Sequence, residues 1–156
     1  MSMEIHAFSD RQLASIEVWQ QPIAAAGFDL RLTAERPFEA LQGFLPAQAG
    51  GRATGFECYH DDARELMAAY TGVDFARPWK HALSSRRGAQ LAECLAAYMA
   101  AAAYAEATDG VLFDPEEGQI MSAQKAVETV REMERYLLAI EAERARSHDQ
   151  SNEPPS

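Results

Sequence analysis

An alanine-rich stretch, residues 88–108, is the feature that most constrains how this chain can fold. After Gly88 it contains neither proline nor glycine, and alanine has the highest helix propensity of all residues. Leu95, Tyr98 and Met99 recur at helical spacing, and most positions between them are alanine. A helix that is apolar nearly all round is normally buried on several sides. The sequence therefore predicts a central core helix whose small side chains let neighbouring elements approach closely.

Shorter segments have the periodicities of helices and strands. Helical spacing follows Ser9 and Asp10, which are candidate caps, and it continues to a glycine stop at Gly27. Pro22 is expected either to kink this helix near Gln20 or to start a second short turn. Further helices are predicted over residues 63–70 and 122–145, and short strands over residues 3–8, 28–33, 55–59, 79–84, 111–113 and 119–121.

Residues 34–54 are the least regular part of the chain, because they contain two prolines and three glycines. Four apolar side chains, Phe38, Leu41, Phe44 and Leu45, are expected to anchor this segment against the core. We therefore predict an ordered surface loop here.

Strands and helices interleave without βαβ units of regular length, which predicts an α+β fold. The expected architecture is a small, mostly antiparallel sheet of four or five short strands packed with three or four helices, among them the buried helix over residues 88–108 and a long helix over residues 122–145. At 156 residues the chain fits one domain, which we assign to residues 1–147. Residues 148–156 are predicted to be a disordered tail.

The chain is acidic, with 24 Asp and Glu residues against 14 Lys and Arg residues and a formal net charge of −10. This balance disfavours nucleic acid or an anionic membrane surface as a partner and favours a basic protein surface. The segment MSMEIHAFSD has no basic region followed by a long apolar run, and the alanine-rich stretch carries Glu93 and Glu106. Neither a secretory signal nor a membrane span is predicted, so we expect a cytoplasmic protein.

No motif of a known catalytic or nucleotide-binding type occurs, since GxxxxGK[ST], GxGxxG and GxSxG are all absent. The densest group of potential metal ligands is Cys58, His60, Asp61 and Asp62. It mixes soft and hard ligands and lacks a second ligand pair, which favours a strand end followed by a helix cap. We predict no metal, no cofactor and no catalytic residue. The alternative is a small enzyme or ligand-binding domain with a pocket near Cys58, His60 and His81.

Acidic side chains gather at two places, around the start of the helix predicted over residues 63–70 and in the turn over residues 114–118. Either cluster alone is equally well explained as an ordinary solvated surface. Together with the net charge, the two clusters indicate a surface that docks on a basic protein, where apolar anchors would supply much of the affinity. The predicted partner-binding residues are Glu57, Asp61, Asp62, Glu65, Asp114, Glu116 and Glu117.

Three stretches resemble a group of small bacterial proteins: GFE at residues 55–57, LAE at residues 91–93 and ATDGVLFDP at residues 107–115. The resemblance spans residues 28–130, and several such proteins are similar to immunity partners of secreted antibacterial toxins of the type VI kind. Related sequences carry Phe-Arg-Trp-Gly before the central helix and Gly-Gly before the valine, where this chain has SRRG and DG. Because these motifs are strand ends, caps and turns, the resemblance implies a shared fold and carries over no functional residue.

The resulting hypothesis is a non-enzymatic immunity or inhibitor protein that neutralises a cognate bacterial toxin by occluding its active site or its substrate path. Charge reversal in the two acidic clusters is expected to weaken toxin binding. A homodimer or larger scaffold, packed through the alanine-rich helix or the last helix, is a third possibility.

Overall fold

The computed structural model describes residues 3–33, 37–88 and 90–151. Over these ranges the chain forms four α-helices and one antiparallel sheet of seven strands, which confirms the α+β class and corrects the predicted strand number upward. The helices are α1 (Ile16–Ala25), α2 (Ala63–Ala69), α3 (Leu91–Ala107) and α4 (Ala123–Ser151), with a 3-10 turn η1 (Phe38–Ala40). The strands are β1 (Met3–Ser9), β2 (Leu30–Leu32), β3 (Gln42–Ala49), β4 (Arg52–Asp61), β5 (His81–Arg87), β6 (Val111–Asp114) and β7 (Gln119–Ser122), in the sheet order β2-β3-β4-β5-β1-β6-β7.

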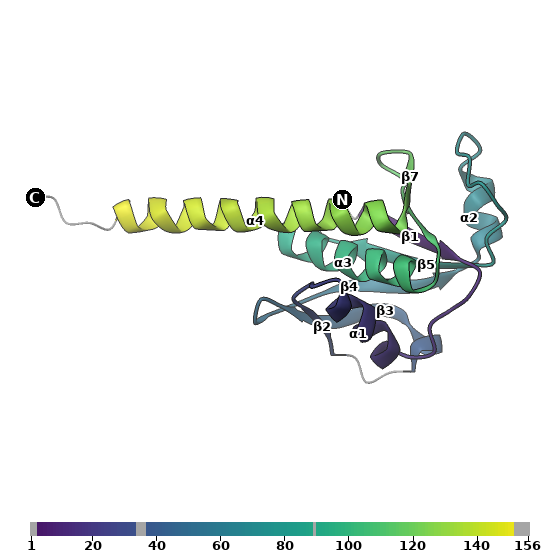
Figure 1. Ribbon diagram of the computed structural model, residues 1–156, viewed down its shortest axis with the longest axis horizontal. Helices are drawn as coiled ribbons and strands as arrows, with labels where there is room; N and C mark the ends of the chain where they lie inside the picture. Colours follow the sequence, from purple (N-terminus) through teal and green to yellow (C-terminus); the bar gives the residue numbers. More distant parts are fainter. Residues whose placement is uncertain (1–2, 34–36, 89, 152–156) are drawn as a thin grey trace, which may run out of the picture.

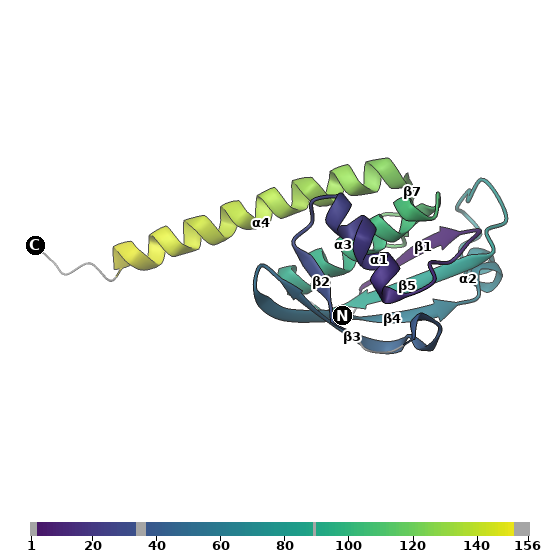
Figure 2. The same ribbon diagram turned by 60° about the horizontal axis from the view of Figure 1, so that its bottom comes forward.

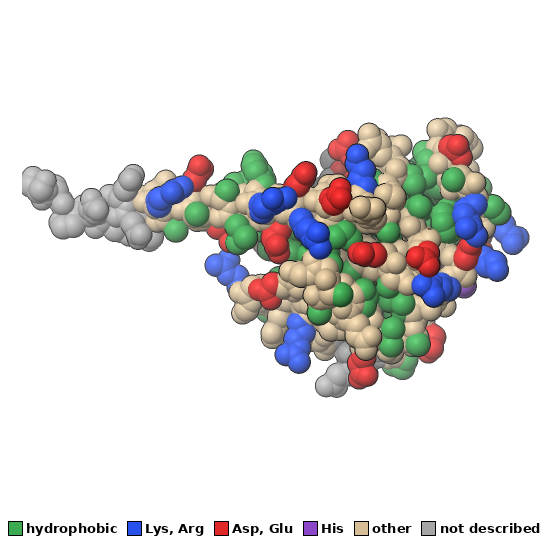
Figure 3. All heavy atoms as spheres, viewed as in Figure 1, with side chains coloured by type: hydrophobic (Ala, Val, Ile, Leu, Met, Phe, Trp, Pro, Cys, Tyr) green, Lys and Arg blue, Asp and Glu red, His purple; other side chains and the backbone are tan. Residues whose placement is uncertain are grey.

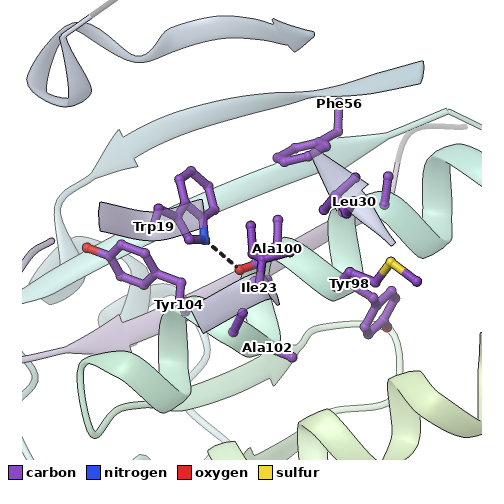
Figure 4. Packing of buried hydrophobic residues seen from close by; sticks show 14 of the residues in the cluster. Trp19, Ile23, Leu30, Phe56, Tyr98, Ala100, Ala102 and Tyr104 are labelled. Atoms are coloured by element: carbon purple, nitrogen blue, oxygen red, sulfur yellow. Dashed lines mark hydrogen bonds between the residues drawn. The ribbon is translucent and has the colours of Figure 1, made fainter. Parts of the chain in front are cut away.

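Helix α3 is the buried centre of the fold, as predicted, and every residue from Cys94 to Ala105 is buried. The sheet packs on one side of it, while α1 and α4 pack on others (Figure 1). Small side chains allow this close approach on several sides. The indole Nε1 of Trp19, from α1, donates a hydrogen bond to the carbonyl oxygen of Ala100 at 2.9 Å in the middle of α3 (Figure 4).

Strand β3 lies in the segment that was expected to be an irregular loop, and that prediction is wrong. Gly50 and Gly51 have φ angles of 58° and 77°, the left-handed values of a tight hairpin turn, so β3 pairs with β4 along its whole length. The nitrogen of Pro46 faces the side of β2, where the Pro46 carbonyl oxygen accepts a hydrogen bond from the N–H of Thr33 at 3.0 Å but proline has no N–H to donate in return. The missing donor falls at the end of the pairing between β2 and β3, and β3 tolerates the proline there.

The two faces of the sheet are covered unequally. Helices α1, α3 and α4 lie on one face and bury the main core (Figure 2). On the other face a smaller core forms at one end, where α2 and the loop after it cover Phe8, Ala82 and Phe113 with Phe75 and Trp79. Within the described ranges, no helix covers the remainder of that face over β3 and β4. We call this remainder the open face.

Helix α1 begins later than predicted. Its N-cap is Ser15, whose Oγ accepts a hydrogen bond from the backbone N–H of Val18 at 3.0 Å, and not Ser9 or Asp10. Pro22 lies within the helix without ending it, and Gly27, with a φ of 82°, follows its C-terminus as predicted.

The side chain of Gln20 occupies the place of a neighbouring strand along the outer edge of β2. Its Nε2 donates to the carbonyl oxygen of Leu30, and its Oε1 accepts from the N–H of Leu32, each at 2.8 Å. A paired strand would make the same two hydrogen bonds with these groups. Gln20 therefore satisfies an edge that would otherwise be open to strand addition.

Helix α4 is longer than predicted and projects from the body of the protein (Figure 1). It follows Ser122, which caps it as expected, and continues to Ser151, so residues 148–151 of the predicted tail are helical. Residues 152–156 of that tail lie outside the described residues. The first half of α4 packs on α3, and Arg131 donates to the carbonyl oxygen of Ala26 at 2.9 Å. Residues 141–147 are all exposed.

Enlarging a side chain in the middle of α3 should destabilise the fold. Ala97 is 0% exposed, so Ala97→Leu forces the sheet and the flanking helices apart and is expected to lower the free energy of unfolding by about 1–3 kcal/mol. Urea unfolding followed by circular dichroism measures this change. The matched control is Ala142→Leu on the exposed part of α4, expected to change the value by less than about 0.5 kcal/mol. Equal effects of the two variants would contradict close packing around α3.

Removing the Gln20 amide should destabilise the β2 edge. Gln20→Ala leaves the Leu30 carbonyl and the Leu32 N–H without their protein partners, and the free energy of unfolding should fall by about 1–2 kcal/mol. Gln21→Ala, at the exposed neighbouring position, is the control and should be near neutral. Hydrogen exchange at the Leu32 amide gives a second readout, since faster exchange is expected only in the Gln20 variant.

Candidate functional site

The first predicted acidic cluster extends from the middle of β4 into the first turn of α2. Glu57 is half-buried on the sheet, Asp61 is exposed at the end of β4, and Glu65 is exposed on α2. Asp62 is the N-cap of α2, and its Oδ1 accepts hydrogen bonds from the backbone N–H groups of Arg64 at 2.9 Å and Glu65 at 3.2 Å. Its carboxylate therefore has a structural role at the helix start.

The second predicted cluster lies in the turn between β6 and β7. Glu116 and Glu117 are exposed there. Asp114 is only 8% exposed: its Oδ2 accepts from the Tyr98 hydroxyl of α3, and its Oδ1 accepts from the backbone N–H of Glu116 at 3.0 Å. The Asp114 carboxylate thus ties the turn to the central helix, and it is not presented at the surface.

The fold places these two clusters at the same end of the molecule. Tyr70, at the C-terminus of α2, packs its ring on Phe113 of β6 with the ring centres 5.0 Å apart, so α2 and the β6–β7 hairpin are neighbours. Basic groups lie among the carboxylates, because Arg64 and Lys80 line a hollow of about 460 Å³ beside Trp79. Figure 3 shows Lys and Arg side chains together with Asp and Glu at this end. The surface here is of mixed charge, with several exposed carboxylates.

The alternative hypothesis placed a pocket near Cys58, His60 and His81, but these three residues do not line the hollows of the structure. Cys58 is 0% exposed, and burial raises the pKa of its thiol to about 12, which disfavours the nucleophilic thiolate. His60 Nε2 lies 2.8 Å from the carbonyl oxygen of Phe38, to which it donates. His81 is at the start of β5 opposite Ser9. Hollows of about 790, 460 and 420 Å³ occur around the described residues, and none is lined by Cys58, His60 or His81.

A buried histidine that the sequence analysis did not single out lies between β1 and β5. His6 Nδ1 is 2.6 Å from Ser84 Oγ, and His6 Nε2, which has no hydrogen-bond partner among the described residues, is 3.6 Å from Glu4 Oε2. These are the residue types of a serine–histidine–carboxylate triad. However, His6 is 0% and Ser84 is 3% exposed, so the hydroxyl is closed to a substrate. The contact between His6 and Ser84 therefore serves to link β1 to β5.

One row of side chains crosses the open face. The strand register aligns Phe44 of β3, Glu57 of β4, Arg86 of β5 and Glu4 of β1. Arg86 Nε donates to Glu4 Oε1 at 2.6 Å, and the Arg86 guanidinium carbon lies 5.7 Å from the centre of the Tyr59 ring. Phe44 is 58% exposed, although it was predicted to be a buried anchor. Glu57 was among the predicted partner-binding residues. The row as a whole was not predicted, because Phe44 joins it through β3 and this segment was predicted to be a loop.

Comparison with known protein families, with curated proteins and with solved structures gave no match. In the part of the chain that the structure describes, no helix has both the length and the apolar character needed to cross a membrane. Over the same ranges, no three His, Cys, Asp or Glu side chains are grouped so that they could hold a metal ion.

Acidification should destabilise the protein through His6. Burial lowers the pKa of His6 below its ordinary value of 6.5, opposed by the carboxylates of Glu4, Asp61 and Asp114. The unfolded chain therefore binds a proton at a higher pH than the folded chain does, and the free energy of unfolding falls as the pH drops below about 6.5.

Urea unfolding at about pH 7 and about pH 5.5 measures this dependence. His6→Asn removes the titrating ring, and the loss between the two pH values should be smaller in the variant. An equal loss in both proteins would show that other groups cause the acid sensitivity.

Proposed function

We propose that this chain is a non-enzymatic immunity protein that binds a cognate bacterial toxin and blocks its active site. The observation that carries the proposal is a set of exposed carboxylates on three neighbouring parts of the fold: the end of β4, the first turn of α2 and the β6–β7 hairpin. We call this region the acidic end and define it by Asp61, Glu65, Glu116 and Glu117. The resemblance to immunity partners of secreted toxins and the net charge of −10 point in the same direction.

Charge at the acidic end suits recognition of a basic toxin surface. Exposed carboxylates are hydrated and screened, so they contribute to association rate and specificity more than to affinity. Asp62 and Asp114 are left out of the acidic end because backbone groups and the Tyr98 hydroxyl already hold their carboxylates. A toxin with a basic cleft, such as a nuclease, fits this surface, and its bound inhibitor would keep substrate out of the cleft.

The first test uses the gene that neighbours the one encoding this chain. Expressed alone in a laboratory bacterium, its product should stop growth, and co-expression of this chain should restore growth. The two purified proteins should also form a complex in size-exclusion chromatography with light scattering. The proposal fails if the neighbouring product is harmless, or if it remains toxic and unbound in the presence of this chain.

Charge reversal at the acidic end should slow association with that toxin. Glu116→Lys combined with Glu117→Lys is expected to lower the association rate constant about 10-fold, and to make it less dependent on salt, because long-range attraction is lost. Surface plasmon resonance at several salt concentrations measures both effects. The control, Glu132→Lys combined with Glu143→Lys on α4, changes the net charge equally at exposed positions elsewhere. Equal slowing by both variants would remove the acidic end from the proposal.

A further inference from the structure

The open face carries a pre-positioned aromatic side chain. Phe44 is 58% exposed on β3, and its ring lies against the backbone of Gly55 on β4. A Cβ atom at position 55 would collide with the Phe44 ring and would lie 2.8 Å from the carbonyl oxygen of Leu45. Glycine at position 55 therefore lets the ring rest on the neighbouring strand while most of Phe44 stays exposed.

A hollow of about 420 Å³ lies beside this ring. Its apolar wall includes Phe44, Pro46 and Ala53, and Glu93, from the first turn of α3, is the one ionisable residue among the described residues that line it. Glu93 has no ion-pair partner within 4.0 Å among the described residues. Glu57, directly across from Phe44 in the strand register, adds a second carboxylate nearby. The hollow thus combines an aromatic face with negative charge.

We propose that this hollow, defined by Phe44, Pro46, Gly55 and Glu93, receives a lysine or arginine side chain of the toxin. This inference rests on the proposed function. A cation is attracted to the face of an aromatic ring, and its aliphatic stem packs on apolar surface while its charged end pairs with a carboxylate. Arg86, the basic residue of the row that crosses the open face, does not occupy the hollow, because its side chain donates to Glu4 and lies over the ring of Tyr59.

The hollow and the acidic end fit one continuous interface. They lie towards opposite ends of β4, with Gly55 at the hollow and Asp61 at the acidic end. Six residues of strand span about 20 Å, which fits within a standard protein–protein contact of about 800 Å² on each partner. Tyr59, which is half-buried, and Arg86, which is exposed, lie in the middle of this path and are of the residue types enriched in such contacts.

The test measures binding of the purified toxin from the neighbouring gene to variants of the hollow. Phe44→Ala is expected to raise the dissociation constant at least about 10-fold, and Glu93→Gln about 3-fold or more, by isothermal titration calorimetry. Phe44 is mostly exposed, so its variant should keep the unfolding free energy of the parent, which is checked in urea. The matched control is Tyr136→Ala on α4, an exposed aromatic residue (68%) outside the proposed interface, expected to change the dissociation constant less than about 2-fold.

The possible outcomes separate this inference from the proposed function. If the parent protein does not bind the toxin, the proposed function fails. If the parent binds and Phe44→Ala binds equally well, the hollow is not the docking site, although the immunity proposal stands. If light scattering shows a dimer of this chain that Phe44→Ala dissociates, the hollow is occupied by a second copy and the inference is wrong.

Discussion

All-round burial of α3 is the constraint on which the rest of the structure depends. A helix with no polar side must have neighbours in every direction, and here the sheet, α1 and α4 provide them. Alanine contributes little apolar area of its own, so the stabilisation comes from large side chains that reach the helix. Trp19 does so from α1, and within α3 itself Tyr104 packs its ring 5.5 Å from that of Trp19. Close packing between small and large partners, and not helix amphipathicity, therefore orders this core.

This constraint also determines where a partner can bind. Because α1 and α4 are used to enclose α3, α2 and the loop after it are the described segments left to cover the opposite face of the sheet. They reach as far as Phe8 and Phe113, and beyond them the strands face solvent. The side chains exposed there stand on paired strands, so their positions are fixed before any partner arrives. A rigid anchor of this kind loses little entropy on binding.

The parts of the fold that sequence reasoning predicted are those with local causes. The composition of α3, the glycine after α1 and the Asp62 cap of α2 each act within a few residues. Strand β3 was not predicted because glycine and proline within it disfavour a strand locally. The strand forms through its pairing with β2 and β4, which are not part of that local pattern. The exposure of Phe44 and the burial of His6 depend on which part of the sheet is covered, and no local pattern contains that information.

Local backbone contacts divide the predicted acidic residues. Asp62 and Asp114 lie at a helix start and a turn, where they bond to nearby backbone N–H groups. Asp61 and the glutamates at positions 65, 116 and 117 remain exposed. Counting acidic residues along the sequence thus overstates the charge available to a partner, and Arg64 and Lys80 reduce it further at the same end. An interface with this modest net charge needs an apolar anchor for affinity, and the exposed ring of Phe44 offers more apolar contact to a partner than any single carboxylate does.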